Sequence, residues 1–409
     1  MFASRSYLPL WVGQLISNLG DTIHYVALVV LVYRVSGSGL AVSAAVAFEI
    51  VPILLLGPVA GVVIDRLPRK AVLIGSDLAR AALVLALAFT RELWLIYALT
   101  FLLASAGIFF NPAAQATIPA IVDKEALVAA NSVGWLTGRL VQLIASAVGG
   151  GLVAWLGTTP AFLFNAATFA LSALAISTMH IPPHAGELSA QSKRGLGSYF
   201  GDALEGLRYA RRDPFISRLL PVQALAALSV GATSALLVVL AEQHLGLPPA
   251  GFAWLLGAIA VGGIIGSATL GALLREPGDT RLLFVPYVVR GVGDVLIAVF
   301  TPLPVALLLM FVYGTMTSTG AVAYAALMQT RVPEGVRGRV YTTVDVTWQL
   351  MRLTSLAVGG ALVDTVGVRG VYYAGGALLV AAGLLGLRLL GSDVAGPRSA
   401  TYHSKTGTS

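Results

Sequence analysis

The sequence predicts an all-α integral membrane protein with twelve transmembrane helices in two pseudo-symmetric halves of six helices each. Three observations predict this class. The 409 residues are 57% hydrophobic and 11% charged, with a mean hydropathy of +0.85, whereas soluble domains carry about 25% charged residues. Apolar runs of about 20 residues, the length that crosses a bilayer, recur along the chain. Short motifs in the first half return in the second half.

The spans follow from the apolar runs and from the polar breaks between them. The first span comes after Arg5 and is too long for the apolar core of a signal peptide. The longest break falls halfway along the chain, where Pro182-Pro183 ends the sixth span. The predicted spans are 8–33, 39–64, 71–90, 93–111, 130–156, 160–180, 215–241, 251–274, 282–301, 303–327, 340–363 and 370–390.

Four regions are therefore expected: a first six-helix bundle (1–180), a cytoplasmic linker (181–214), a second bundle (215–391) and a disordered cytoplasmic tail (392–409). Within the linker, apolar residues from Leu196 to Leu207 recur at helical spacing, and Arg208, Arg211 and Arg212 follow them. This pattern predicts an amphipathic helix lying along the inner membrane surface. The tail is rich in Ser, Gly and Thr, a composition that does not support a core.

The basic residues predict the orientation. With the N-terminus inside, nineteen of the 26 Lys and Arg residues fall on inner segments and only Arg34, Arg91 and Arg369 on outer ones. Positive charge is retained on the cytoplasmic side of membrane proteins, so both termini are expected in the cytoplasm. The net charge of +7 is explained in this way and does not indicate nucleic acid. The remaining four basic residues lie inside spans: Arg80, Arg139, Arg290 and Arg352.

The two halves repeat at an offset of about 210 residues. Gly61–Asp65 after the second span matches Gly271–Arg275 after the eighth, and Val148–Gly150 matches Val358–Gly360. Corresponding loops lie on the same side of the membrane, so the repeat is parallel. Such a repeat places a substrate site near the midplane between the halves, where alternating access exposes it to each side in turn.

Polar residues inside the first two spans are the candidates for proton coupling, because ionisable groups are costly at this depth. Gln14, Asn18, Asp21 and His24 recur at steps of three or four residues and share one face of the first span. Glu49 lies at similar depth in the second span. We expect Asp21 and Glu49 to bind protons, with His24 as a relay; the alternatives are a packed Asp21–His24 pair and a Glu49 satisfied by span 11 or water.

Other intramembrane residues divide into substrate-binding and structural candidates. Arg139 and Arg352, at corresponding positions of the two halves, would neutralise a cavity carboxylate, bind an anionic substrate or bridge the halves. The further substrate-binding candidates are Gln14, Asn18, Tyr97, Phe101, Gln223, Tyr313 and Thr317, for which ordinary packing is the alternative. Asp77 with Arg80, and Arg290 with Asp294, have the spacing of ion pairs within one helix and are predicted to be structural.

Several motifs resemble the Major Facilitator Superfamily. The loop after the second span has Gly61, three residues, Asp65-Arg66, and then Arg69-Lys70. The segments that resemble its macrolide-efflux and enterobactin-exporter branch are Asn111–Pro119 with Ala130-Asn131, Glu205–Pro214 and Arg337–Val340. The second-half loop departs from the pattern, since Arg275 stands where Asp65 does, and the Gly-Pro step of drug antiporters is represented only by Gly149–Gly151.

The resemblance implies a drug:proton antiporter of the cytoplasmic (inner) membrane that confers antibiotic resistance. It would act as a monomer on a small-molecule substrate, driven by protons and without a cofactor. The alternative is a siderophore or other metabolite exporter of the same fold. The loop residues Gly61, Asp65, Arg66 and Arg69 would form a conformational switch, with Asp65 contacting the start of span 11 when the inner side is closed.

Other function classes lack their sequence signatures. None of the four lysines follows a glycine, so no phosphate-binding Walker loop is present, and the five histidines and zero cysteines show no metal-ligand spacing. No catalytic motif of a membrane hydrolase or protease occurs either, so we expect no enzyme. A non-transporting membrane sensor is the remaining alternative of another class.

Overall fold

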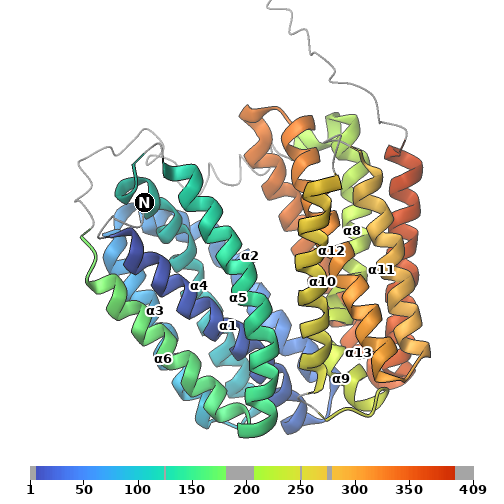
Figure 1. Ribbon diagram of the computed structural model, residues 1–409, viewed down its shortest axis with the longest axis horizontal. Coiled ribbons are helices and arrows are strands. Elements are labelled where there is room, and N and C mark those ends of the chain that lie inside the picture. The colour runs from blue at the N-terminus through green and yellow to red at the C-terminus, as the bar shows by residue number, and fades with distance from the viewer. Residues whose placement is uncertain (1–5, 124–125, 181–206, 249–250, 274–278, 392–409) are drawn as a thin grey trace, which may run out of the picture.

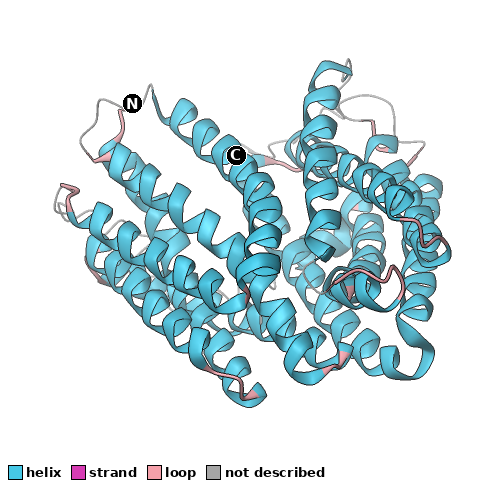
Figure 2. Cartoon of the chain, turned by 60° about the horizontal axis from the view of Figure 1, so that its bottom comes forward, coloured by secondary structure: helices cyan, strands magenta, loops and turns pink. Residues whose placement is uncertain are grey.

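The computed structural model describes residues 6–123, 126–180, 207–248, 251–273 and 279–391. Within these ranges the chain is helical apart from short connections (Figure 2). The helices form two groups, one from each half of the chain (Figure 1). In the first group α1 packs on α5 and α6, α3 packs on α6 and α4, and α4 packs on α2. In the second group α13 packs on α8 and α11, and α12 packs on α10 and α11.

The helix bounds agree with the predicted spans to within a few residues at most ends. The first group comprises α1 (Tyr7–Ser36), α2 (Gly39–Arg66), α3 (Arg69–Phe89), α4 (Leu93–Ile121), α5 (Leu127–Leu156) and α6 (Thr158–Ser177). The second comprises α8 (Pro214–Ala235), α9 (Leu237–Gln243), α10 (Phe252–Leu273), α11 (Arg281–Val299), α12 (Leu303–Arg331) and α13 (Glu334–Leu390).

Each of the twelve predicted ranges falls on helix. Span 7 is α8 followed by α9, and α13 holds spans 11 and 12 on either side of Gly367, whose φ of 72° is not helical. By length and hydropathy, nine helices in the described ranges can cross a membrane. The largest difference is in α4, which was expected to end at 111 but continues through Pro112 and Pro119; neighbouring helices let membrane helices tolerate proline.

The repeat seen in the sequence is present in the backbone. Among the described residues, positive φ angles occur at Gly37 and Gly246, 209 positions apart, and at Gly157 and Gly367, 210 apart. Only glycine adopts this conformation readily. Close helix contacts repeat as well: a Cβ atom on Gly149 would lie 3.2 Å from Ile23 of α1, and one on Gly359 would overlap Ala232 of α8. Each half therefore turns and packs in the same way.

The two groups meet through α2 against α13 and α5 against α10. The contacts concentrate at the end of the bundle away from the N-terminus, and the groups splay apart toward the other end (Figure 1). At the closed end the Gln243 side chain donates a 3.1 Å hydrogen bond to the Tyr33 hydroxyl. The halves are in close contact at Gly39, where a Cβ would lie 2.7 Å from a methyl group of Val363 and would force it to shift.

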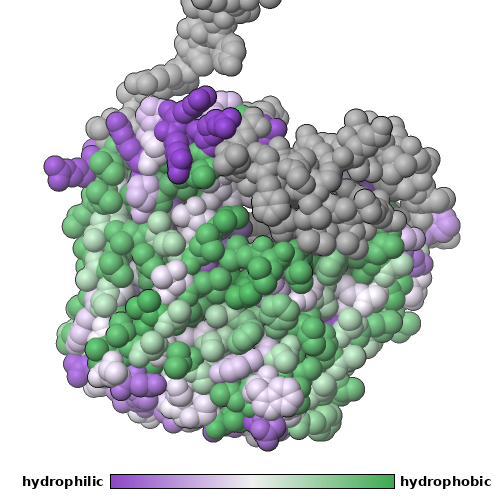
Figure 3. Space-filling model, turned by 180° about the vertical axis from the view of Figure 1, so that it is seen from behind, coloured by the Kyte–Doolittle hydropathy of each residue, from purple (hydrophilic) through white to green (hydrophobic). Residues whose placement is uncertain are grey.

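Apolar side chains cover the middle of the molecule, and hydrophilic side chains gather toward the two ends of the helices (Figure 3). Large side chains such as Trp155, Leu174 and Leu308 are 90%, 64% and 61% exposed. A soluble monomer rarely exposes so much apolar surface. This surface is suited to the hydrocarbon core of a bilayer.

Only the end of the predicted linker lies within the described residues. Residues 207–212 are helical, and the rest of the expected amphipathic helix lies outside the described residues, as does the tail. The segment ends at Asp213, whose carboxylate accepts hydrogen bonds from the backbone N–H groups of Phe215 (3.0 Å) and Ile216 (2.9 Å). Pro214 follows as the first residue of α8. Asp213-Pro214 therefore starts the second half by capping its first helix.

Replacing Asp213 by Ala should destabilise the second half. Two backbone N–H groups lose their acceptor, and removal of such a cap costs about 0.5–2 kcal/mol. We expect a lower thermal unfolding midpoint for the detergent-purified protein, measured by tryptophan fluorescence. Asp213→Asn keeps a capping oxygen and should restore most of the loss; equal midpoints for Asp213→Ala and the wild type would contradict the capping role.

Candidate transport site

A cavity of about 430 Å³ lies between the two halves. One turn after another of α1 contributes its polar face, through Asn18, Asp21, Thr22 and Tyr25, and Gly138 of α5 and Leu256 of α10 also line the cavity. The residues come from both halves, as expected for a site served by alternating access. Asn18 and Asp21 were predicted to line it; Thr22 and Tyr25, one turn further on, share their helical face.

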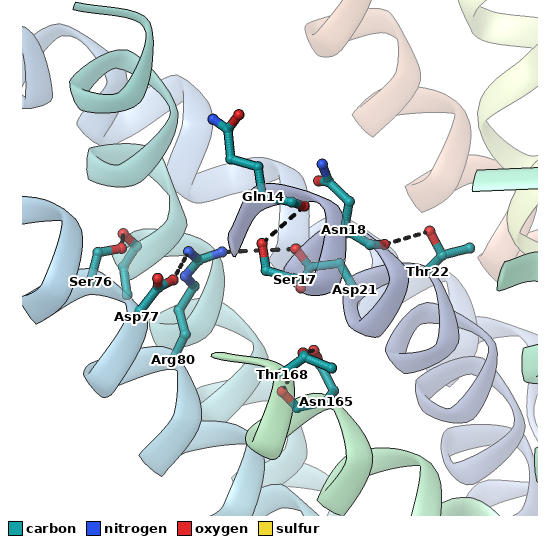
Figure 4. A network of polar contacts seen from close by, with 11 residues as sticks. Gln14, Ser17, Asn18, Asp21, Thr22, Ser76, Asp77, Arg80, Asn165 and Thr168 are labelled. Atoms are coloured by element: carbon teal, nitrogen blue, oxygen red, sulfur yellow. Dashed lines mark hydrogen bonds and ion pairs between the residues drawn. The ribbon is translucent and has the colours of Figure 1, made fainter. Parts of the chain in front are cut away.

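Asp21 is held by a charged group from another helix. The Arg80 guanidinium of α3 lies 3.8 Å from the Asp21 carboxylate and also binds Asp77, one turn earlier in α3 (Figure 4). The Asp21 side chain is 45% exposed, whereas those of Arg80 and Asp77 are 8% and 0% exposed. Arg80 therefore bridges a carboxylate open to the cavity and a carboxylate closed off from it.

Aromatic rings and α6 fix this arrangement. The Arg80 guanidinium lies over the rings of Phe110 (4.5 Å) and Phe169 (4.2 Å), a favourable cation–π geometry. Asn165 and Thr168 of α6 pack against Gly20 of α1, where a Cβ would overlap both side chains. Gly20 thus allows α1 to approach α6 and brings Asp21 next to the α3 pair.

Glu49 of α2 belongs to the same electrostatic environment. It interacts with the positive charge of Arg352 from α13 and with the negative charge of Asp21, and Tyr25 interacts with both Glu49 and Arg352. Neither Glu49 nor Arg352 has a hydrogen bond or an ion pair within 4.0 Å among the described residues. The structure therefore brings together Asp21 and Glu49, which the sequence placed at similar depth on two spans, and adds Arg352 of α13 to them.

The predicted ion pair in α11 is not formed. Arg290 lies one turn from Asp294, but its guanidinium donates a 2.7 Å hydrogen bond to the Tyr313 hydroxyl of α12, and no oxygen of Asp294 comes within 4.0 Å of it. A partner on a neighbouring helix has replaced the partner on the same helix. In contrast, the Asp77–Arg80 pair of α3 is formed as predicted.

Four other predicted substrate residues make their contacts outside this cavity. The Gln223 carbonyl oxygen accepts a 2.5 Å hydrogen bond from Tyr287 in the interior of the second group. Tyr97 donates to the Ala41 backbone and stacks on Phe48, which also contacts Phe101. Thr317 donates to the Tyr313 carbonyl oxygen one turn earlier. None of these side chains lines the cavity around Asp21.

His24 and Gln14 also lie away from that cavity. The His24 ring is 4% exposed and packs edge-on against Phe162 of α6, 5.3 Å between centroids. Neither of its nitrogens has a hydrogen-bond partner among the described residues. The structure does not bring His24 to Asp21. Gln14 lies one turn before Asn18, and its backbone oxygen accepts from Ser17.

The loop after α2 is described in part. Arg69 donates a 2.5 Å hydrogen bond to the Ala116 carbonyl oxygen of α4. Lys70 donates to the Ser177 and Met179 carbonyl oxygens at the C-terminus of α6 (2.6 and 2.7 Å), where a cation complements the helix dipole. The structure assigns Gly61, Asp65, Arg66 and Arg139 to helices, but the surroundings of Gly61 and the side chains of the other three lie outside what it describes.

Sequence reasoning assigned Arg80 to a structural pair and did not connect it with Asp21. The contact depends on α1 and α3 both packing against α6, which spacing along one helix does not report. Asn165 was missed for the same reason. The available signal was the position of Arg80, one of four arginines inside spans.

A bundle of membrane-spanning helices in two repeated halves, with a polar cavity between them, is the architecture of a membrane transporter. The family model for transmembrane secretion effectors matches residues 2–396. The chain therefore belongs to this family of Major Facilitator Superfamily transporters.

Relatives and solved structures are similar over nearly the whole chain. The uncharacterized transporter YfiS of Bacillus subtilis is 26% identical, with 96% of this chain and 95% of the relative covered. The multidrug efflux pump Tap of Mycolicibacterium fortuitum is 27% identical (88% and 90%), and macrolide efflux protein A of Streptococcus pyogenes 21% (91% and 93%). The nucleoside transporter NupG shares the fold with a TM-score of 0.73 at 14% identity (95% and 99%).

Proposed function

We propose that the protein exports amphipathic or cationic drugs and related lipophilic compounds in exchange for protons. The observation that carries the proposal is Asp21, a partly exposed carboxylate in a cavity between the halves, close to the second carboxylate of Glu49. The similarity to the multidrug efflux pump Tap and macrolide efflux protein A supports drugs as the substrate class.

The exchange follows from charge. An ionised carboxylate in a low-dielectric cavity is costly and is stabilised by one positive charge. A proton and a cationic substrate group both provide that charge, so each displaces the other. Tyr25, Val26 and Leu256 give the cavity an apolar wall, which suits the lipophilic part of such a substrate.

The proposal includes the topology. The basic residues favour cytoplasmic termini in the inner membrane of a bacterial cell, so the end at which the two helix groups splay apart (Figure 1) would face the cytoplasm. The halves at 1–180 and 215–391 would rock about the site as two domains of a monomer, and the loop with Gly61, Asp65 and Arg66 would act as a switch on the inner face.

Arg352 favours a second candidate function. Its guanidinium faces Glu49 across the two halves and has no hydrogen-bond partner among the described residues. A free guanidinium binds carboxylates and catecholates, so export of a siderophore or another anionic metabolite is the alternative.

The direct test is expression in a host that lacks its own efflux pumps. We expect the minimal inhibitory concentration of cationic and macrolide drugs to rise several-fold and the accumulation of a cationic dye to fall, and an uncoupler should abolish both effects. Unchanged susceptibility over a broad panel, with siderophore secretion increased, would favour the alternative function. Efflux that continues with the uncoupler present would contradict proton antiport.

A further inference from the structure

The two halves carry the same pair of charges in opposite order. Asp77 and Arg80 in α3 correspond to Arg290 and Asp294 in α11, 213 and 214 positions later, and both arginines are 7% exposed. Their partners differ. Arg80 binds two carboxylates, Asp77 and Asp21, whereas Arg290 donates to the neutral Tyr313 hydroxyl. Arg80 therefore connects the first pair with Asp21, a residue that lines the cavity.

We propose that Asp77 and Arg80 are positioning residues that set the net charge at Asp21, so that the site takes up a single positive charge. This inference deepens the proposed proton antiport and rests on it for its role in transport. Asp21, Asp77 and Arg80 form a charged triad. Asp77 is the permanent counter-ion of Arg80, and Asp21 is the member of the triad that exchanges its charge.

Charge counting explains why two carboxylates share one arginine. Arg80 with Asp21 alone would form a neutral pair, which needs no further cation. Addition of Asp77 makes the triad carry one net negative charge when both carboxylates are ionised. A proton or a cationic substrate group then makes it neutral, and Asp77 keeps the buried guanidinium paired in that state.

Exposure determines which carboxylate exchanges its charge. The Asp77 side chain is fully buried and bound to Arg80. The Asp21 side chain is 45% exposed toward the cavity and lies 3.8 Å from Arg80, a looser contact. A proton or substrate that enters the cavity meets Asp21 first, while Asp77 stays buried beside Arg80.

The other charged groups near Asp21 come from the helices around it. Glu49 of α2 and Arg352 of α13 interact electrostatically with one another and provide one charge of each sign. On α1, His24 packs against Phe162 of α6. The side chain of Arg139 on α5 lies outside the described residues. The described residues that contact α1 from α6 near Asp21 are neutral, Asn165 and Thr168.

The test measures protonation of Asp21 directly in the purified full-length protein. Infrared difference spectra report the C=O band of a protonated carboxyl group, and the band that Asp21→Asn removes belongs to Asp21. At a fixed pH the protonated fraction should rise in Arg80→Gln and fall in Asp77→Asn, because the first variant removes a positive and the second a negative charge. An opposite charge at this distance changes proton affinity by roughly tenfold or more.

The double variant Asp77→Asn/Arg80→Gln separates charge compensation from packing. It restores the single net negative charge and leaves no unpaired buried ion, so it should titrate within about threefold of the wild type although both side chains have changed. Arg80→Lys, which keeps the charge, should also titrate like the wild type. The proposal would be overturned if both single variants changed the protonated fraction of Asp21 in the same direction. It would also be overturned if the double variant changed that fraction as much as Arg80→Gln does.

The second half provides the matched control. Arg290→Gln and Asp294→Asn remove equally buried charges that do not interact with Asp21, so they should leave its band unchanged; equal shifts in both halves would also overturn the proposal. The two hypotheses fail separately. If the triad titrates as described but the protein transports no drug, only the proposed function is contradicted. If the protein exchanges drugs for protons but the triad variants leave the Asp21 protonation unchanged, only this inference is contradicted.

Discussion

Asp21→Asn and Glu49→Gln are each expected to abolish proton-driven export while the protein remains folded. Both substitutions keep the shape of the side chain and remove its charge. Asp21→Asn leaves Arg80 paired with Asp77 as a neutral unit, so the cavity no longer attracts a proton. Glu49→Gln leaves Arg352 without the carboxylate that it faces.

The measurement is substrate uptake into inverted membrane vesicles driven by a pH gradient. Both variants should fall to the level of vesicles that lack the protein, with a thermal unfolding midpoint close to that of the wild type. Asp294→Asn is the matched control, because this buried carboxylate interacts with neither Asp21 nor Glu49, and it should keep most of the transport. Full gradient-driven transport by Asp21→Asn and Glu49→Gln would exclude them as coupling residues.

The helices could be predicted because the bilayer leaves few alternatives. Every backbone group inside it needs an internal partner, so a long apolar run becomes a helix. The error at α4 has a physical cause: Asn111-Pro112 is a helix-ending signal in water, but α4 continues to Ile121. The repeat was also readable, because the Gly149 and Gly359 motifs mark the same close contact in each half.

The site was predicted in part because depth along a span can be read from sequence but contacts between spans cannot. Asp21 and Glu49 were predicted to lie at similar depth, and the structure brings them into one electrostatic environment together with Arg352. The direction in which a side chain points within the bundle depends on all neighbouring helices. That is why Arg290 bonds to Tyr313 of α12 instead of Asp294, and why His24 lies against Phe162.

Linking the two halves at their closed end is expected to stop transport. The Tyr33 hydroxyl of α1 and the Gln243 amide at the end of α9 are 3.1 Å apart, and Gly39 lies against Val363 nearby. Alternating access requires this end to open in one part of the cycle. The chain contains no cysteine, so Tyr33→Cys/Gln243→Cys introduces the only two thiols.

A short, reducible thiol cross-linker should therefore join Tyr33→Cys to Gln243→Cys and abolish efflux, and a reductant should restore it. The control is Arg91→Cys/Thr159→Cys, two residues of the first half at the same end of the bundle, whose side chains are 2.9 Å apart. If the halves move as rigid bodies, a link within one half leaves their relative motion free, and this variant should keep its efflux. Efflux that persists through the Tyr33–Gln243 link would mean that the closed end does not open during transport, whereas loss of efflux in both variants would place the essential motion within the first half.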